Sequence, residues 1–334
     1  MAGVSRATRP RYIAERLPRD TVHIHAPSRS FAETLVAALP DRRCEIWDDA
    51  AAVLAGLPDA RCIVAGGLPP GAAARARQLR WVHALGGGVD ALVDELPPAA
   101  SLVRVTGVCE AAVSEHAWAL LLALARELPL ACEQQRARVW RPFATRQLAG
   151  CTLGVLGLGA IGGRIAALGH GFGMRVLATR RGLRAPTDPG PAELGVYVHP
   201  PEATATVLAA ADVVVVALPR TPATRGLLGP DLLAQMRPGA RLVVISRGGI
   251  VDESALIDRL RCGAIAGAAL DVAAEEPLPP DSPLWGAPNL LLTPHVAGWS
   301  PDYARQVAAV VRANLEHIAA GRAPPGLVDR TRGY

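Results

Sequence analysis

Three stretches of the sequence place reactive side chains where a site could form. "ISRGGIVDESAL" contains Arg247, "ALDVAAEEPLPPDSPLW" contains Glu276, and "LLTPHVAGWS" contains His295. Each stretch begins where an apolar run predicted to be a strand ends, and open α/β sheets bind ligands beyond the carboxyl ends of their strands. A guanidinium can pair with an anion, and an imidazole next to a carboxylate can transfer protons. The three stretches together predict an acid/base site with an anion clamp.

A glycine-rich turn points to a nucleotide. "LGVLGLGAIGGRIAALG" places Gly157, Gly159 and Gly162 after an apolar strand and before an alanine-rich helix. In that order the first glycine permits a tight turn, the second lets a pyrophosphate approach the backbone, and the third lets the helix pack on the strand. The N-terminus of the helix, starting near Ala160 and Ile161, then offers free N–H groups to the phosphates. This pattern predicts a dinucleotide site.

The end of the next predicted strand, "RVLATRRG", favours a particular dinucleotide. NAD-binding proteins usually place an acid there, which holds the adenosine ribose, but this chain has Arg180 and Arg181. The next acid, Asp188, follows Pro186 and lies too far beyond the strand. Two guanidiniums suit a 2′-phosphate, so we expect NADP(H) to be preferred, with NAD(H) possible. The alternative is a solvated pair in an arginine-rich chain.

Two series of short apolar runs alternate with helix-like segments and must position these residues. The first comprises "TVHIHA", "CIVAGG", "LRWVHALG" and "SLVRVTG"; the second comprises "CTLGVLG", "MRVLAT", "DVVVVAL", "ARLVVIS", "IAGAALDV" and "NLLLTP". Alternation of this kind predicts parallel sheets covered by helices on both faces. The fold class is therefore α/β, with two doubly wound parallel sheets. A final amphipathic helix over residues 302–320 is expected to return to the first domain.

A long apolar helix is predicted over residues 111–128. Because exposing such a helix to water on an isolated subunit costs free energy, we expect a homodimer.

The composition excludes several classes of protein. Half of the 334 residues are hydrophobic, so the chain is not intrinsically disordered, and no apolar stretch is long enough to span a bilayer. The first twenty residues lack the apolar segment of a secretory signal, so we expect a cytoplasmic protein that does not bind membranes. The net charge of +5 comes from scattered arginines, which does not indicate nucleic-acid binding. The six cysteines lack metal-ligand spacing, so no metal site is expected.

With these motifs the chain resembles the D-isomer-specific 2-hydroxyacid dehydrogenase family over nearly its whole length. The resemblance runs from "LRWVHALGGGVD" through the glycine turn and "ALPRTPATRGLL" to "RGGIVDESAL", "DVAAEEPL" and "TPH". It implies a Rossmann cofactor domain (residues 109–299) inserted into a flavodoxin-like substrate domain (residues 1–108 and 300–334).

The resemblance also implies a reaction and roles for residues. A small 2-keto acid such as glyoxylate or hydroxypyruvate is reduced by NADPH to the D-2-hydroxy acid. Arg247 clamps the substrate carboxylate, Glu276 pairs with the histidine, and His295 donates the proton. Backbone N–H groups of Gly87 and Gly88 complete the anion site. The expected cofactor contacts are Gly157, Gly159, Ala160, Ile161, Gly162, Arg180, Arg181, Leu218, Pro219, Ser246 and Asp271.

Two alternatives stay open. A dinucleotide-sensing interaction protein of the same fold, without catalysis, can carry the same three polar residues. Trp140 and Trp299 can either wall the substrate pocket, Trp140 from a partner subunit, or serve only in packing. Among other members of the family, formate dehydrogenases have a glutamine in place of Glu276 and phosphite dehydrogenases use a lysine, a residue this chain lacks.

Overall fold

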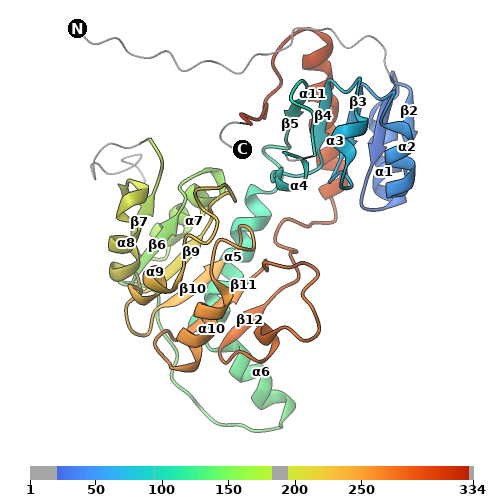
Figure 1. Ribbon diagram of the computed structural model, residues 1–334. Helices are drawn as coiled ribbons and strands as arrows, with labels where there is room; N and C mark the ends of the chain where they lie inside the picture. Colours follow the sequence, from blue (N-terminus) through green and yellow to red (C-terminus); the bar gives the residue numbers. More distant parts are fainter. Residues whose placement is uncertain (1–20, 94, 183–194, 331–334) are drawn as a thin grey trace, which may run out of the picture. The chain divides into compact units, whose positions relative to one another are not determined.

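The computed structural model describes residues 21–93, 95–182 and 195–330, which form two compact units (Figure 1). One unit contains the described residues up to Cys109 and those from Ser300 onwards, and the other contains Glu110–Trp299. That the units bind substrate and cofactor respectively stays a prediction.

The first unit is built on a five-stranded parallel sheet with the order β2-β1-β3-β4-β5. This is the flavodoxin-like order, as expected. The strands are β1 (Val22–His25), β2 (Cys44–Ile46), β3 (Cys62–Ala65), β4 (Trp81–Ala84) and β5 (Ser101–Val103). The helices are α1 (Arg29–Ala38), α2 (Ala50–Gly56), α3 (Ala72–Arg75), α4 (Asp90–Val93) and α11 (Tyr303–Ala319).

Helix α11 is joined to strand β4 through a buried polar contact. Asn314 donates from Nδ2 to Nε2 of His83 at 2.8 Å, and His83 donates from Nδ1 to the carbonyl oxygen of Ala84 at 2.7 Å. His83 is 2% exposed, and burial lowers its pKa to about 4. The ring is therefore neutral in the folded protein at neutral pH, with the hydrogen on Nδ1.

The second unit contains a seven-stranded parallel sheet with the order β12-β11-β10-β9-β6-β7-β8. Counted within the unit, this is the doubly wound Rossmann order extended by one strand, which confirms the predicted fold class. The strands are β6 (Thr152–Leu156), β7 (Arg175–Thr179), β8 (Val196–His199), β9 (Val213–Val216), β10 (Arg241–Val244), β11 (Gly267–Leu270) and β12 (Leu290–Leu292). The helices are α5 (Glu110–Ala125), α6 (Leu128–Arg136), α7 (Ala160–Gly171), α8 (Thr204–Ala210), α9 (Pro230–Ala234) and α10 (Glu253–Arg261).

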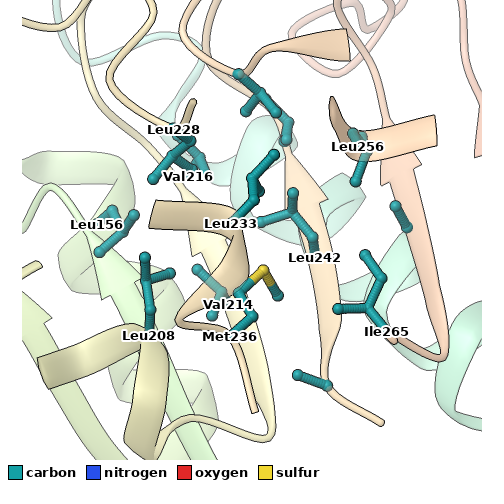
Figure 2. Packing of buried hydrophobic residues seen from close by; sticks show 14 of the residues in the cluster. Leu156, Leu208, Val214, Val216, Leu228, Leu233, Met236, Leu242, Leu256 and Ile265 are labelled. Carbon is teal, nitrogen blue, oxygen red and sulfur yellow. The ribbon is translucent and has the colours of Figure 1, made fainter. Parts of the chain in front are cut away.

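The core of this unit lies between the central strands and the helices that cover them. Figure 2 shows Val214, Val216 and Leu242 from the sheet packed among Leu233 and Leu256 from the helices. All of them are completely buried. A sheet covered in this way holds its strand ends rigidly, which is what a precise site at that edge requires.

The helix predicted over residues 111–128 is interrupted. Helix α5 ends at Ala125, Glu127 adopts a left-handed conformation with φ of 53°, and α6 begins at Leu128. Most of the large apolar side chains of α5, including Trp118 and Leu121, are buried within the unit itself. The apolar character of α5 therefore does not require a partner subunit, and that reason for expecting a homodimer was wrong.

The described ranges contain neither a helix that could span a membrane nor a cluster of metal-binding side chains. Within residues 21–93, 95–182 and 195–330, no helix combines the length and apolar character needed to cross a bilayer. Across the same ranges, no cluster of three or more His, Cys, Asp or Glu side chains could hold a metal ion.

Candidate active site

The three reactive residues follow three neighbouring parallel strands. The register pairs Val244 of β10 with Leu270 of β11, and Leu270 with Leu292 of β12. The carboxyl ends of these strands are therefore level, and the loops that follow them lie side by side at one edge of the sheet. The loops carry Arg247, Glu276 and His295.

Glu276 and His295 form a direct pair. The Nδ1 atom of His295 lies 2.6 Å from Oε2 of Glu276, and Oε1 of the same carboxylate accepts a hydrogen bond from the backbone N–H of Ala273 at 2.9 Å. Because an ionised carboxylate only accepts, Nδ1 carries the hydrogen of the pair. The other ring nitrogen, Nε2, has no partner among the described residues, and the imidazole is 43% exposed. It is thus accessible to a small molecule.

The backbone at His295 adopts a strained conformation, which hydrogen bonds to Asp271 stabilise. Its φ is 53°, in the left-handed region that non-glycine residues seldom adopt. Its N–H donates to the backbone oxygen of Asp271 at 2.8 Å. The next two N–H groups, of Val296 and Ala297, donate to the Asp271 carboxylate at 3.0 Å each. Asp271 thus holds the loop that carries His295.

The loops that carry Arg247 and Glu276 are in direct contact. A Cβ on Gly248 would overlap with the backbone carbonyl of Ala273, so only glycine fits there. The Glu253 carboxylate accepts a hydrogen bond from the N–H of Ala274 at 2.6 Å. Burial raises the pKa of the Glu253 carboxyl, and the negative charges of Asp252 and Glu276 act in the same direction.

Arg247 itself is half-buried, and its Nη1 donates to the carbonyl oxygen of Ser246 at 2.7 Å. The Ser246 side chain is buried, and its Oγ has no hydrogen-bond partner in the described part of the chain. A buried polar atom without a partner is costly unless a ligand or water satisfies it.

The glycine turn has the geometry that the sequence predicts. Gly157 has φ of 101°, and a Cβ there would lie 2.8 Å from the carbonyl oxygen of Ala217. At Gly162 a Cβ would overlap with the carbonyl of Gly157, so α7 packs against the turn only because this residue is glycine. Gly159 precedes α7 without a side-chain cap, and among the described residues no atom other than those of its immediate neighbours lies within 4 Å of a Cβ built there. The turn thus leaves the N-terminus of α7 open to an anion.

Of the other expected cofactor residues, Ala160, Ile161 and Leu218 lie at this turn, whereas Ser246 and Asp271 follow β10 and β11. Ala160 and Ile161 are the first two residues of α7. A Leu218 methyl lies 3.1 Å from a Cβ built on Gly157, and Pro219 follows it in an exposed position. Asp271 is only 1% exposed and its carboxylate accepts bonds from the His295 loop, so this geometry favours a supporting role over direct cofactor contact.

The two arginines lie just beyond β7. Thr179, the last residue of β7, accepts a hydrogen bond from the N–H of Gly157 at 3.2 Å, so this strand end adjoins the glycine turn. Arg180 and Arg181 follow with exposed side chains, and the N–H of Arg180 donates to the carbonyl oxygen of His199. Asp188 lies outside the described residues.

The glycines expected to bind the substrate anion belong to the first unit and directly follow β4. Tyr303 donates from its hydroxyl to the carbonyl oxygen of Leu85 at 2.7 Å, which ties α11 to the start of this loop. The N–H groups of Gly87 and Gly88 donate to no acceptor in the described part of the chain.

Sequence reasoning missed three residues that contact the site loops: Glu253, Thr293 and His116. The first two stand inside motifs that were recognised for other residues. His116 lies beside the polar Ser114 and Glu115 in α5, so the sequence carried no signal that distinguished it.

The strand orders and the glycine turn define an α/β protein with a dinucleotide-binding fold, and the adjoining Arg247, Glu276 and His295 loops lie at one edge of its second sheet. Residues 118–297 match the model of the D-isomer specific 2-hydroxyacid dehydrogenase family, NAD binding domain. The chain belongs to this family, which confirms the resemblance seen in the sequence and the nicotinamide dinucleotide cofactor.

Individual relatives carry more specific names. The chain is 39% identical over 238 residues to a glyoxylate reductase of Aeropyrum pernix, a match that covers 69% of each protein. It is 33% identical over 271 residues to glyoxylate/hydroxypyruvate reductase A of Yersinia enterocolitica, covering 77% of this chain and 82% of the relative. An NADPH-dependent glyoxylate/hydroxypyruvate reductase from Sinorhizobium meliloti, solved with NADP and sulfate, aligns with a TM-score of 0.83 and 27% identity. That alignment covers 94% of this chain and 99% of the other.

Proposed function

We propose that this protein reduces a small 2-keto acid, such as glyoxylate or hydroxypyruvate, to the D-2-hydroxy acid with NADPH as reductant. The observation that carries the proposal is the 2.6 Å contact between His295 Nδ1 and Glu276, in a ring that is accessible and whose Nε2 has no partner in the part of the chain that the structure describes. The names of the relatives support the substrate class.

The charges of the substrate suggest how the residues act. The Arg247 guanidinium pairs with the carboxylate of the keto acid and orients the adjacent carbonyl. When bound, the nicotinamide cofactor supplies a hydride to the carbonyl carbon. Negative charge then develops on the carbonyl oxygen, and His295 as imidazolium donates a proton to that oxygen from Nε2. Glu276 stabilises the imidazolium and fixes the ring orientation through Nδ1. In the first unit, the N–H groups of Gly87 and Gly88, which have no acceptor in the described part of the chain, suit a substrate anion.

Residues in the second unit fit the cofactor. The uncapped N-terminus of α7 and the open space at Gly159 suit a pyrophosphate. The Oγ of Ser246, just beyond β10, has no partner in the described ranges and offers a hydrogen bond to a polar group of the cofactor.

Arg180 and Arg181 support NADPH over NADH. They follow the strand end that adjoins the glycine turn, where an NAD-binding protein places its acid. Guanidiniums at that position bind a 2′-phosphate through charge-assisted hydrogen bonds. The Sinorhizobium meliloti reductase, an NADP complex, gives this preference a precedent in a similar protein.

We also propose that the protein acts as a homodimer in the cytoplasm. Five large apolar side chains are solvent-exposed within one short segment: Leu128, Leu130, Val139, Trp140 and Phe143. Trp140 is 98% exposed, and we call this set the 128–143 patch. A patch of this kind on one segment is typical of a protein interface, and a second copy of the chain is the partner we infer.

Oxidation of NADPH in the presence of a panel of 2-keto acids tests the proposed activity. We expect turnover with glyoxylate or hydroxypyruvate and slower turnover with NADH. Binding of NADPH without turnover of any keto acid would favour the dinucleotide-sensing alternative instead.

A further inference from the structure

A buried carboxylate accepts hydrogen bonds from the loop that carries His295. Asp271 follows β11 and is 1% exposed. A buried carboxylate needs partners that compensate for its lost hydration. One of them comes from a distant part of the sequence: Nε2 of His116, on helix α5, lies 3.3 Å from Oδ1 of Asp271.

Thr293 connects these two residues, and the contact defines which atoms carry hydrogen. The Thr293 hydroxyl lies 2.7 Å from Oδ1 of Asp271 and 3.0 Å from Nε2 of His116. Because a carboxylate only accepts, the hydroxyl donates its single hydrogen to Asp271. Nε2 of His116 must therefore carry a hydrogen and donate it to the Thr293 oxygen. His116 thus holds the hydroxyl aimed at the carboxylate.

This network ends at the reactive histidine. Asp271 accepts bonds from the N–H groups of His295, Val296 and Ala297, which fix the left-handed backbone of His295. A strained conformation of this kind persists only where its surroundings hold it. Any shift of Asp271 moves the imidazole by way of the backbone.

We propose that His116 is a positioning residue for the reduction: it touches no substrate, and it keeps His295 oriented through Thr293 and Asp271. The inference rests on the proposed function of His295 as proton donor. It adds to the site a residue on helix α5 that lies more than 170 positions from His295 in the sequence.

Substitutions of His116 test this role. His116→Leu removes the donor, and His116→Gln keeps an N–H donor at a similar distance from the backbone. We expect kcat with glyoxylate to fall at least tenfold in the leucine variant and to stay within about threefold of the unmodified protein in the glutamine variant. The dissociation constant for NADPH should change less than twofold in both. His170→Leu, on the exposed end of α7, serves as the control and should match the unmodified protein.

A double variant separates positioning from general damage. If His116 acts through His295, adding His116→Leu to His295→Ala should not lower the residual single-turnover rate further. An unchanged kcat in His116→Leu, an equal loss in the glutamine variant, or an additive loss in the double variant would each overturn the inference.

A measurement without turnover distinguishes this inference from the proposed activity. In protein labelled with ¹⁵N-histidine, NMR detects the Nδ1–H of His295 bonded to Glu276. We expect His116→Leu to weaken or shift this signal and His116→Gln to preserve it. If the signal changes in His116→Leu and is preserved in His116→Gln, but the protein shows no reductase activity, the proposed function is contradicted and the positioning role is supported. An unchanged signal in His116→Leu would overturn the positioning role whatever the activity.

Discussion

At the scale of single residues, Glu276 serves two parts of the site with one carboxylate. Oε1 binds the N–H of Ala273 in its own loop, and Oε2 binds Nδ1 of His295 in the next loop. An amide in its place could accept only through its one oxygen, because its nitrogen is a donor. The choice of Glu over Gln is therefore set by two donors that face it.

Cofactor preference also belongs to this scale. Arg180→Asp replaces a guanidinium with the acid that NAD-using relatives carry. We expect the ratio of kcat/KM with NADPH to that with NADH to fall about 10- to 100-fold. A charged hydrogen bond contributes about 1.5–3 kcal/mol, and each 1.4 kcal/mol corresponds to a factor of ten. Steady-state kinetics with both cofactors at a fixed keto-acid concentration measures the ratio.

Arg322→Asp makes the same charge change at an exposed position of the first unit and should leave the ratio unaltered. An equal ratio in both variants and in the unmodified protein would mean that Arg180 is merely solvated.

At the scale of elements, sequence patterns located the strand ends but not the contacts between loops. Continuous apolar runs and glycines mark where β6, β10, β11 and β12 end, and so Arg247, Glu276 and His295 could be predicted to share one edge. That Gly248 packs on Ala273 depends on how two loops meet in space, as does the Glu253 contact with Ala274. No local pattern encodes such a contact.

Two short strands, β2 and β8, were not predicted from the sequence, for a different reason. β2 and β8 are edge strands, one in each sheet. Tyr197 in the middle of β8 is exposed, as is Glu45 in β2, so neither strand forms a continuous apolar run. Strands of three or four residues that are only half covered carry too weak a periodic signal.

The buried contact between His83 of β4 and Asn314 of α11 predicts how the free energy of unfolding depends on pH. Burial lowers the pKa of His83 to about 4 from its ordinary 6.5. As the pH falls from 6.5 to 4, the unfolded chain therefore binds a proton that the folded chain does not. Stability contributed by His83 is present above pH 6.5 and is lost toward pH 4, by about 3 kcal/mol in total. Denaturant unfolding of the first unit, followed by tryptophan fluorescence at several pH values, measures the loss.

The double variant His83→Leu/Asn314→Leu removes the buried imidazole together with the side chain that donates to it. For each unit that the pH falls over this range, the unfolding free energy of the double variant should decrease by about 1.4 kcal/mol less than that of the unmodified protein. Identical slopes for the two proteins would contradict the assignment of a neutral, buried His83.

At the scale of the whole molecule, the 128–143 patch predicts assembly. We expect the unmodified protein to elute as a dimer in size-exclusion chromatography with light scattering. Leu130→Asp combined with Trp140→Asp should yield monomers, because a charge in the apolar centre of an interface leaves it desolvated and unpaired. Leu168→Asp, at an exposed leucine on α7, should remain dimeric. A monomeric unmodified protein, or a dimer unaffected by the two aspartates, would contradict the assignment of this patch as the interface.

The measurement that tests the central claim most directly compares turnover and cofactor binding in His295→Ala. General acid catalysis contributes about 10²–10⁴-fold to a rate, so kcat for keto-acid reduction should fall within that range. The dissociation constant for NADPH, followed by cofactor fluorescence, should remain within twofold of that of the unmodified protein. Undiminished turnover, or an equal loss of turnover and NADPH binding, would contradict the role of His295 as proton donor.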